Sequence, residues 1–181
     1  MKKYIFYIGG FILPDKNAAA HRVVNNSKLF KKLGYEVVLI GKNDCNEKNN
    51  SIKICNSKLV PGFETLSIKS LSYIGLLKYF YSIKHIVQIL NKYNPSSQKI
   101  VIAYNYPSLA LFFLRKYCLN HNIKLVSDCT EWAQTNKKSF YLIIKNFDTF
   151  FRMKYLNKKL DGIVVISQFL YTYYKKFYTN I

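Results

Sequence analysis

The first forty residues constrain the fold more than any other part of the chain. Residues 3–8 are apolar and predict a buried β-strand, and Gly9-Gly10 directly after them predicts a turn. Residues 17–33 predict a helix closed by a glycine, and residues 35–40 predict a second strand. A strand, turn, helix and strand in this order is typical of a parallel α/β sheet. In such a sheet ligands bind beyond the carboxyl ends of the strands.

The rest of the chain continues the alternation of strands and helices. Further strands are expected at residues 52–55, 99–104, 123–127 and 162–166. Further helices are expected at residues 73–93, 107–120, 139–160 and 168–178, the last of them capped by Ser167. We find no internal repeat and no linker. Residues 1–181 are therefore expected to form one α/β domain, Rossmann-like, with a mostly parallel sheet flanked by helices.

Composition and cysteine spacing exclude several classes of protein. Half of the residues are hydrophobic and 17% are aromatic, which excludes a disordered chain. No apolar run reaches the roughly 20 residues that cross a bilayer. Cys45, Cys55, Cys118 and Cys129 form no CxxC pair and have no ligand-like spacing with the histidines. They predict no metal site and reduced thiols in a cytoplasmic protein.

The net charge of +19 leaves two interpretations open. The first is a solvated basic surface. The second is attraction to an anionic membrane surface, where each basic residue contributes about 1 kcal/mol, which would place the chain on the inner face of the membrane. Nucleic acid is not expected as a partner, because only Arg22, Arg115 and Arg152 are arginines among the 28 basic residues and the lysines are scattered.

Two predicted loops at the carboxyl edge of the sheet hold candidate ligand contacts. Gly9-Gly10 would let a phosphate approach the backbone, although a tight turn alone also explains a glycine pair. The full GxGxxG and P-loop patterns are absent. His21, one turn into the first helix, is either a ligand contact or an ordinary surface histidine. Asn105 and Tyr106 follow the strand at 99–104 and would hydrogen-bond a polyol.

The richest cluster of functional side chains follows the strand at 123–127. Asp128, Glu131 and Trp132 fall within five residues, and they include two of the nine acidic residues and the only tryptophan. Carboxylates bind sugar hydroxyls and an indole stacks on the C–H face of a sugar ring. The alternative is structural, with Asp128 or Thr130 capping the next helix.

These segments together resemble a known family. Gly9-Gly10, residues 18–22, residues 34–40, residues 124–132 and residues 160–167 are similar, in order and spacing, to the N-terminal half of GT-B glycosyltransferases. The similarity is to the retaining family 4 type, glycosyl transferase group 1, which serves capsular or surface polysaccharide biosynthesis. It covers nearly the whole chain.

The resemblance implies a two-domain enzyme that moves a sugar from a nucleotide-sugar donor to a glycan or lipid-linked acceptor. The N-terminal domain would hold the acceptor, with Gly9 and Gly10 facing the donor diphosphate and with Asp128 and Glu131 beside the acceptor or transferred sugar. It implies no metal and no bound cofactor other than the donor. Many members have His-Asp where this chain has Ser127-Asp128, so the role of that histidine is not carried over and no catalytic residue is assigned.

The resemblance also implies a C-terminal nucleotide-sugar domain, for which this sequence holds no counterpart. We therefore expect the chain to be inactive alone and to act with a separate chain that carries the other half. Two alternatives stand beside this interpretation. One is a non-catalytic sugar- or membrane-binding module. The other is a Rossmann-like nucleotide-binding protein, which is disfavoured because Gly41, Lys42 and Asn43 offer no acidic residue for a ribose and Asp44 comes late.

Overall fold

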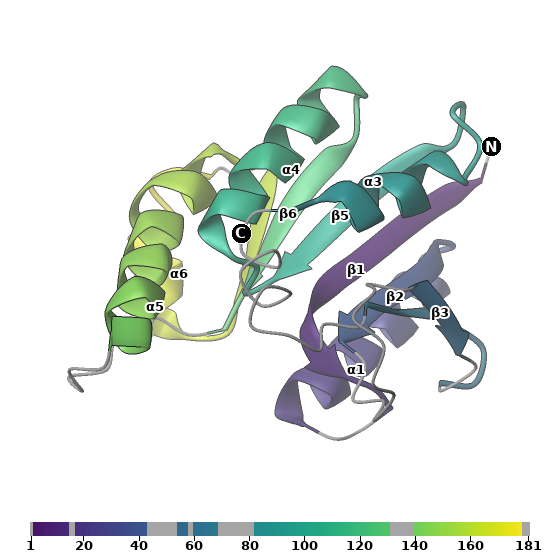
Figure 1. Ribbon diagram of the computed structural model, residues 1–181, viewed down its shortest axis with the longest axis horizontal. Helices are drawn as coiled ribbons and strands as arrows, with labels where there is room; N and C mark the ends of the chain where they lie inside the picture. Colours follow the sequence, from purple (N-terminus) through teal and green to yellow (C-terminus); the bar gives the residue numbers. More distant parts are fainter. Residues whose placement is uncertain are drawn as a thin grey trace.

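The structure is a computed structural model that describes residues 2–14, 17–42, 54–57, 60–68, 82–130 and 140–178. In this part of the chain seven strands form one sheet in the order β3-β4-β2-β1-β5-β6-β7 (Figure 1). The strands are β1 (Lys3–Ile12), β2 (Glu36–Lys42), β3 (Ile54–Ser57), β4 (Glu64–Ile68), β5 (Gln98–Tyr104), β6 (Lys124–Cys129) and β7 (Gly162–Val165). The helices are α1 (Ala18–Lys32), α3 (Lys84–Asn91), α4 (Ser108–Asn120), α5 (Phe140–Phe151), η1 (Arg152–Leu156), η2 (Asn157–Lys159) and α6 (Gln168–Tyr174).

The sheet confirms the predicted fold class. Six strands pair in parallel, and only β3 pairs antiparallel, with β4 at one edge. β1 lies between β2 and β5, so the strand order reverses there: the chain builds outward from β1 first on one side and then on the other. In a doubly wound sheet this reversal opens a ligand-binding crevice at the carboxyl ends of the central strands.

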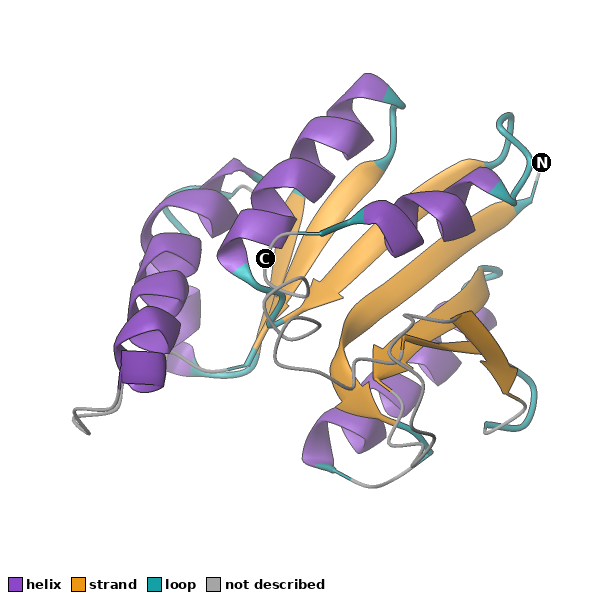
Figure 2. Cartoon of the chain, in the orientation of Figure 1, coloured by secondary structure: helices purple, strands orange, loops and turns teal. Residues whose placement is uncertain are grey.

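Helices cover both faces of the sheet, so its central strands are apolar on both sides. On β1, Phe6 and Ile8 belong to a core cluster that includes residues of α3 and α4, whereas Ile5 and Tyr7 belong to a second cluster that includes residues of α1. Figure 2 shows α3 and α4 in front of the sheet and α1 behind it. A third cluster joins β6 and β7 to η1 and α6.

The predicted glycine turn is wrong, because Gly9 and Gly10 both lie inside β1. Strand β1 continues to Ile12, with a shift of register against β2 after Ile8. A Cβ on Gly9 would lie 2.7 Å from the carbonyl oxygen of Tyr104, so this glycine allows β1 to pass close to β5. The need for a glycine here comes from strand packing rather than from a turn.

Other element boundaries also differ from the sequence-based expectations. Strand β4 was not expected, because it follows a loop and is only five residues long. Of the predicted helix at 73–93, residues 73–81 lie outside the described part. In the remainder, Ser82 and Ile83 precede α3, which is the helical part. The predicted helix at 139–160 is α5, which continues as a π-helical turn, η1, and a 3-10 turn, η2.

The helix ends that the sequence predicted are largely confirmed. Asn17 caps α1 by accepting a hydrogen bond from the backbone N–H of Ala20 at 2.8 Å, and Gly34 follows that helix with a positive φ. Ser167 caps α6 by accepting from the N–H of Leu170 at 3.2 Å. Within the described residues, no helix is long and apolar enough to cross a membrane.

Candidate functional site

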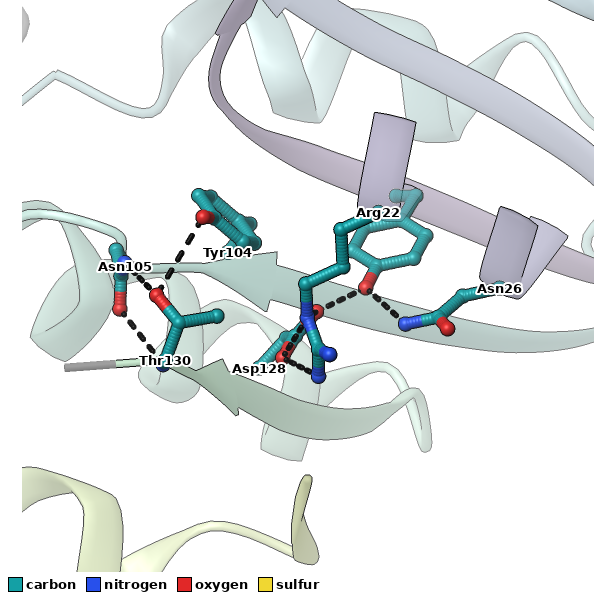
Figure 3. Close-up of polar contacts among 7 residues, drawn as sticks. Arg22, Asn26, Tyr104, Asn105, Asp128 and Thr130 are labelled. Atoms are coloured by element: carbon teal, nitrogen blue, oxygen red, sulfur yellow. Dashed lines mark hydrogen bonds and ion pairs between the residues drawn. The ribbon is translucent and has the colours of Figure 1, made fainter. Parts of the chain in front are cut away.

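A buried carboxylate lies near the carboxyl edge of the sheet, where the strand order reverses. Asp128 is the fifth residue of β6 and is 0% exposed. Its neighbours come from three elements: Tyr7 from β1, Arg22 and Asn26 from α1, and Tyr104 at the end of β5, which pairs with Asp128 in the sheet. Figure 3 shows Arg22 reaching down from α1 onto this carboxylate.

Arg22 and Tyr7 hold both oxygens of Asp128. The Nη2 atom of Arg22 donates to Oδ1 at 2.7 Å, and Nε lies 3.2 Å from Oδ1 and 3.1 Å from Oδ2. The hydroxyl of Tyr7 donates to Oδ2 and itself accepts from Nδ2 of Asn26 at 3.2 Å. The carboxylate therefore has its hydrogen bonds within the protein and faces no solvent. Arg22 keeps 24% of its side chain exposed.

The charges of this cluster stabilise one another. Burial, followed by the charge and the hydrogen bond of Asp128, raises the pKa of the Tyr7 hydroxyl well above its ordinary range, so Tyr7 stays a proton donor. Burial lowers the pKa of Arg22, but the hydrogen bonds and the charge of Asp128 outweigh it and the net shift is upward. The cluster is a fixed ion pair rather than a proton-transfer pair.

A second polar group stands next to this ion pair on the loops after β5 and β6. The amide of Asn105 donates to Oγ1 of Thr130 at 2.7 Å and accepts from the N–H of Thr130 at 3.4 Å (Figure 3). The hydroxyl of Tyr104 lies 3.4 Å from the same oxygen. Asn105 has a φ of 41°, a conformation that asparagine tolerates better than most residues. Its backbone N–H donates to the carbonyl of Asp128 at 3.1 Å.

The structure brings together only some of the residues that the sequence singled out. Asp128 and Asn105 lie side by side at the carboxyl edge, although Asp128 is engaged by Arg22 and Tyr7. Tyr106 is 4% exposed and packs in the core cluster that faces α4. His21 is exposed on α1, next to Arg22 in the chain.

The remaining candidates are less well placed or lie outside the described part. Gly10 is exposed near the end of β1. Glu131 and Trp132 are among the residues that the structure does not describe. Their contact with a sugar, and the contact of Gly9 and Gly10 with a donor phosphate, stay predictions.

Sequence reasoning missed Tyr7 and Arg22. Arg22 carried one signal, because it is one of only three arginines and lies on the first helix of a Rossmann-like unit. Tyr7 carried none, because a tyrosine within an apolar strand is usually a core residue. Both contact Asp128 across more than one hundred residues of chain, and no local pattern reports such a contact.

The described residues include no cluster of histidine, cysteine, aspartate or glutamate that would hold a metal ion. Cys118 and Cys129 are buried, and the thiol of Cys129 donates to Sδ of Met153 at 3.4 Å. Cys45 lies outside the described part, and of Cys55 only the backbone, in β3, is described.

The fold is similar to part of two solved structures. One is an E. coli structure described as trehalose-6-phosphate bound with UDP-2-fluoro glucose, with a TM-score of 0.53 and 9% identity over 96% of this chain. The other is an α,α-trehalose-phosphate synthase (UDP-forming) from Burkholderia vietnamiensis, with a TM-score of 0.52 and 10% identity over 98% of this chain. The chain spans 42% of the length of each. No protein-family model and no curated protein matches the chain. The fold is that of a Rossmann-like GT-B half.

Proposed function

We propose that this chain is the acceptor-binding half of a glycosyltransferase. It would hold a glycan or lipid-linked acceptor while a sugar is moved from a nucleotide-sugar donor, in the assembly of a surface polysaccharide. The observation that carries the proposal is the Arg22–Asp128 ion pair at the point where the strand order reverses. The likeness in fold to a trehalose-phosphate synthase supports the class of reaction.

Arg22 is the side chain that we assign to the ligand. Its Nε and Nη2 atoms face Asp128, whereas Nη1 has no hydrogen-bond partner among the described residues. The buried carboxylate fixes the plane of the guanidinium, so Nη1 is held in one direction at low entropic cost. A fixed guanidinium binds a sugar hydroxyl or a phosphate oxygen well. Asp128 is thus a positioning residue, and Asn105 and Thr130 stand next to it with further polar atoms.

Catalysis would need groups from a second domain. Transfer from a nucleotide sugar requires positive or hydrogen-bonding groups fixed around the departing diphosphate. The described residues provide Arg22 near the sheet edge but no second basic group bound to this cluster. We therefore propose that the donor side comes from a further polypeptide segment or a partner chain, and that the isolated chain binds acceptor without transferring sugar.

Calorimetric titration of the chain tests this function. The probes are hexoses, hexose phosphates, short-chain polyprenyl-diphosphate sugars and UDP-glucose. We expect saturable binding of an acceptor-type probe, weakened at least about tenfold by Arg22→Lys, which keeps the charge but loses the planar fork. Arg115→Lys is the matched control, because Arg115 lies on α4 and donates to the carbonyl of Lys159 at 2.7 Å, away from the cluster.

Two results would contradict the proposal. Binding of UDP-glucose with no binding of any acceptor-type probe would favour the nucleotide-binding alternative. Equal losses in Arg22→Lys and Arg115→Lys would remove Arg22 from the binding site. Asp128→Asn is a poorer probe, because loss of a buried charge changes stability as well as binding.

A further inference from the structure

Exposed apolar side chains gather on one face of α5. At 100° per residue, the spacing places Ile143, Ile144, Phe147, Phe150 and Phe151 within one arc of the helix. Phe147 is 70% exposed and Ile143 is 57% exposed, whereas Thr149, on the opposite side of the helix, is 6% exposed. We call these five side chains the α5 face. A helix of a globular domain normally turns such a stripe toward the core, and here it turns toward solvent.

Aromatic rings extend the α5 face into the π-helical turn η1. The ring of Tyr155 lies 6.2 Å from that of Phe150 and 5.4 Å from that of Phe151, and Tyr155 is 51% exposed. On α4, which contacts α5, Phe112 and Phe113 are 46% and 41% exposed. The apolar surface is thus rich in the aromatic residues that occupy membrane interfaces.

Lysines converge where the chain continues beyond the α5 face. The Nζ atom of Lys158 lies 4.3 Å from the centre of the Phe177 ring, and that of Lys176 lies 5.2 Å from the same centre. The Nζ atom of Lys154, next to Tyr155 in the chain, lies 5.4 Å from the centre of the Tyr173 ring. Like charges gathered around two rings repel one another, and a bound anion relieves this repulsion.

The described carboxylates of this region are engaged elsewhere. Asp148 of α5 accepts from the N–H and the hydroxyl of Ser108, at 2.8 and 2.7 Å, and so caps α4. Asp161 pairs with Lys124 and accepts from the N–H of Leu125, both at 2.9 Å. The surface therefore combines exposed aromatic and aliphatic groups with lysines, in a chain of net charge +19.

From these observations we infer that the α5 face docks on an anionic lipid surface, with its apolar side chains at the acyl boundary and Lys158 and Lys176 at the headgroups. Nucleic acid would use the lysines but not the apolar face. A lipid surface of negative charge uses both, since apolar burial and electrostatic attraction add in interfacial binding. The mode is shallow docking rather than spanning.

Vesicle flotation tests the inference without a sugar donor, so its outcome is independent of sugar binding and transfer. The probes are vesicles of phosphatidylcholine alone and of phosphatidylcholine with phosphatidylglycerol. We expect binding to the anionic vesicles only, reduced about tenfold or more by the double variant Ile143→Ser with Phe147→Ser. A similar loss is expected for Lys158→Gln with Lys176→Gln, whose residual binding should depend less on salt.

Helix α1 and Leu33 directly after it supply matched controls, because α1 packs on β1 and β2. Leu29 and Leu33 are 57% and 70% exposed, as Ile143 and Phe147 are, so their change to serine removes equally exposed apolar groups. Lys28→Gln with Lys32→Gln removes the same charge elsewhere. Circular dichroism of each variant confirms folding.

Three outcomes would overturn the inference. Equal binding to neutral vesicles would remove the role of lipid charge. If the control pairs weakened vesicle binding as much as the test pairs, net charge alone would explain the attraction to the vesicles, and the α5 face would not be the docking site. Absence of vesicle binding, with capture of an acidic protein that depends on Phe147, would assign the α5 face to a protein partner instead.

Discussion

The Arg22–Asp128 pair predicts an asymmetric effect on stability. The two partners differ in burial, because the carboxylate is 0% exposed and the arginine side chain is 24% exposed. In Arg22→Leu the Asp128 charge is left buried with Tyr7 as its remaining side-chain donor. In Asp128→Asn the guanidinium can turn toward water, and the amide still accepts from Tyr7. Arg22→Leu should therefore be the more destabilising change.

The magnitude follows from the geometry of the pair. Removal of one partner from a buried ion pair costs about 3–5 kcal/mol, and we place Arg22→Leu in this range. Asp128→Asn loses charge-assisted bonds but leaves a partly solvated cation, so about 2 kcal/mol is expected. For a domain of 181 residues, the larger cost corresponds to a fall in the melting temperature of about 10 °C.

Urea unfolding followed by circular dichroism measures both costs and the coupling between them. The double variant Arg22→Leu with Asp128→Asn should cost less than the sum of the two single changes, by about 1–3 kcal/mol. The exposed pair Lys2–Glu36, with side chains 71% and 59% exposed, is the control and should show almost no coupling. Equal costs for the two single variants, or a larger cost for Asp128→Asn, would refute the role of burial.

Three further predictions rest on single contacts. The pKa of the Tyr7 hydroxyl is raised from its ordinary value of 10.0, so the stability that the protonated hydroxyl contributes is complete below pH 10 and is lost as the pH rises above that value. Melting temperatures measured at alkaline pH should therefore fall less steeply with pH in Tyr7→Phe than in the unchanged chain. Burial raises the pKa of the Cys118 thiol to about 12, so Cys118 should react with iodoacetamide at pH 8 only after denaturation. Peptide mapping of the labelled native chain checks this, and rapid labelling of Cys118 itself would contradict its burial. Gly9→Ala should cost about 1–3 kcal/mol in urea unfolding, because the new methyl group meets the backbone oxygen of Tyr104, whereas Gly10→Ala, at an exposed position, should cost less.

Sequence reasoning failed at β4, at the glycines of β1 and beyond α5, and each failure has a physical cause. Strand β4 is a short edge-side strand whose apolar pattern is too brief to separate it from a loop. Gly9 is needed by the neighbouring strand, whose position the local sequence does not contain. The helix expected at 139–160 changes after Phe151 to a π-helical and a 3-10 turn, where Met153 and Leu156 are buried in the core, and the local sequence carries no signal for that change.

Local sequence by itself determined the order of strands and helices apart from β4, the cap at Ser167 and the parallel α/β class, because periodicity and capping act over a few residues. It also placed Asp128 and Asn105 at the carboxyl edge, since parallel strands end on one side of the sheet. Only the tertiary structure joined Tyr7 and Arg22 to Asp128, across 121 and 106 residues. Contacts at that separation depend on strand order and helix packing, and these are set by the burial of the whole core rather than by any segment alone.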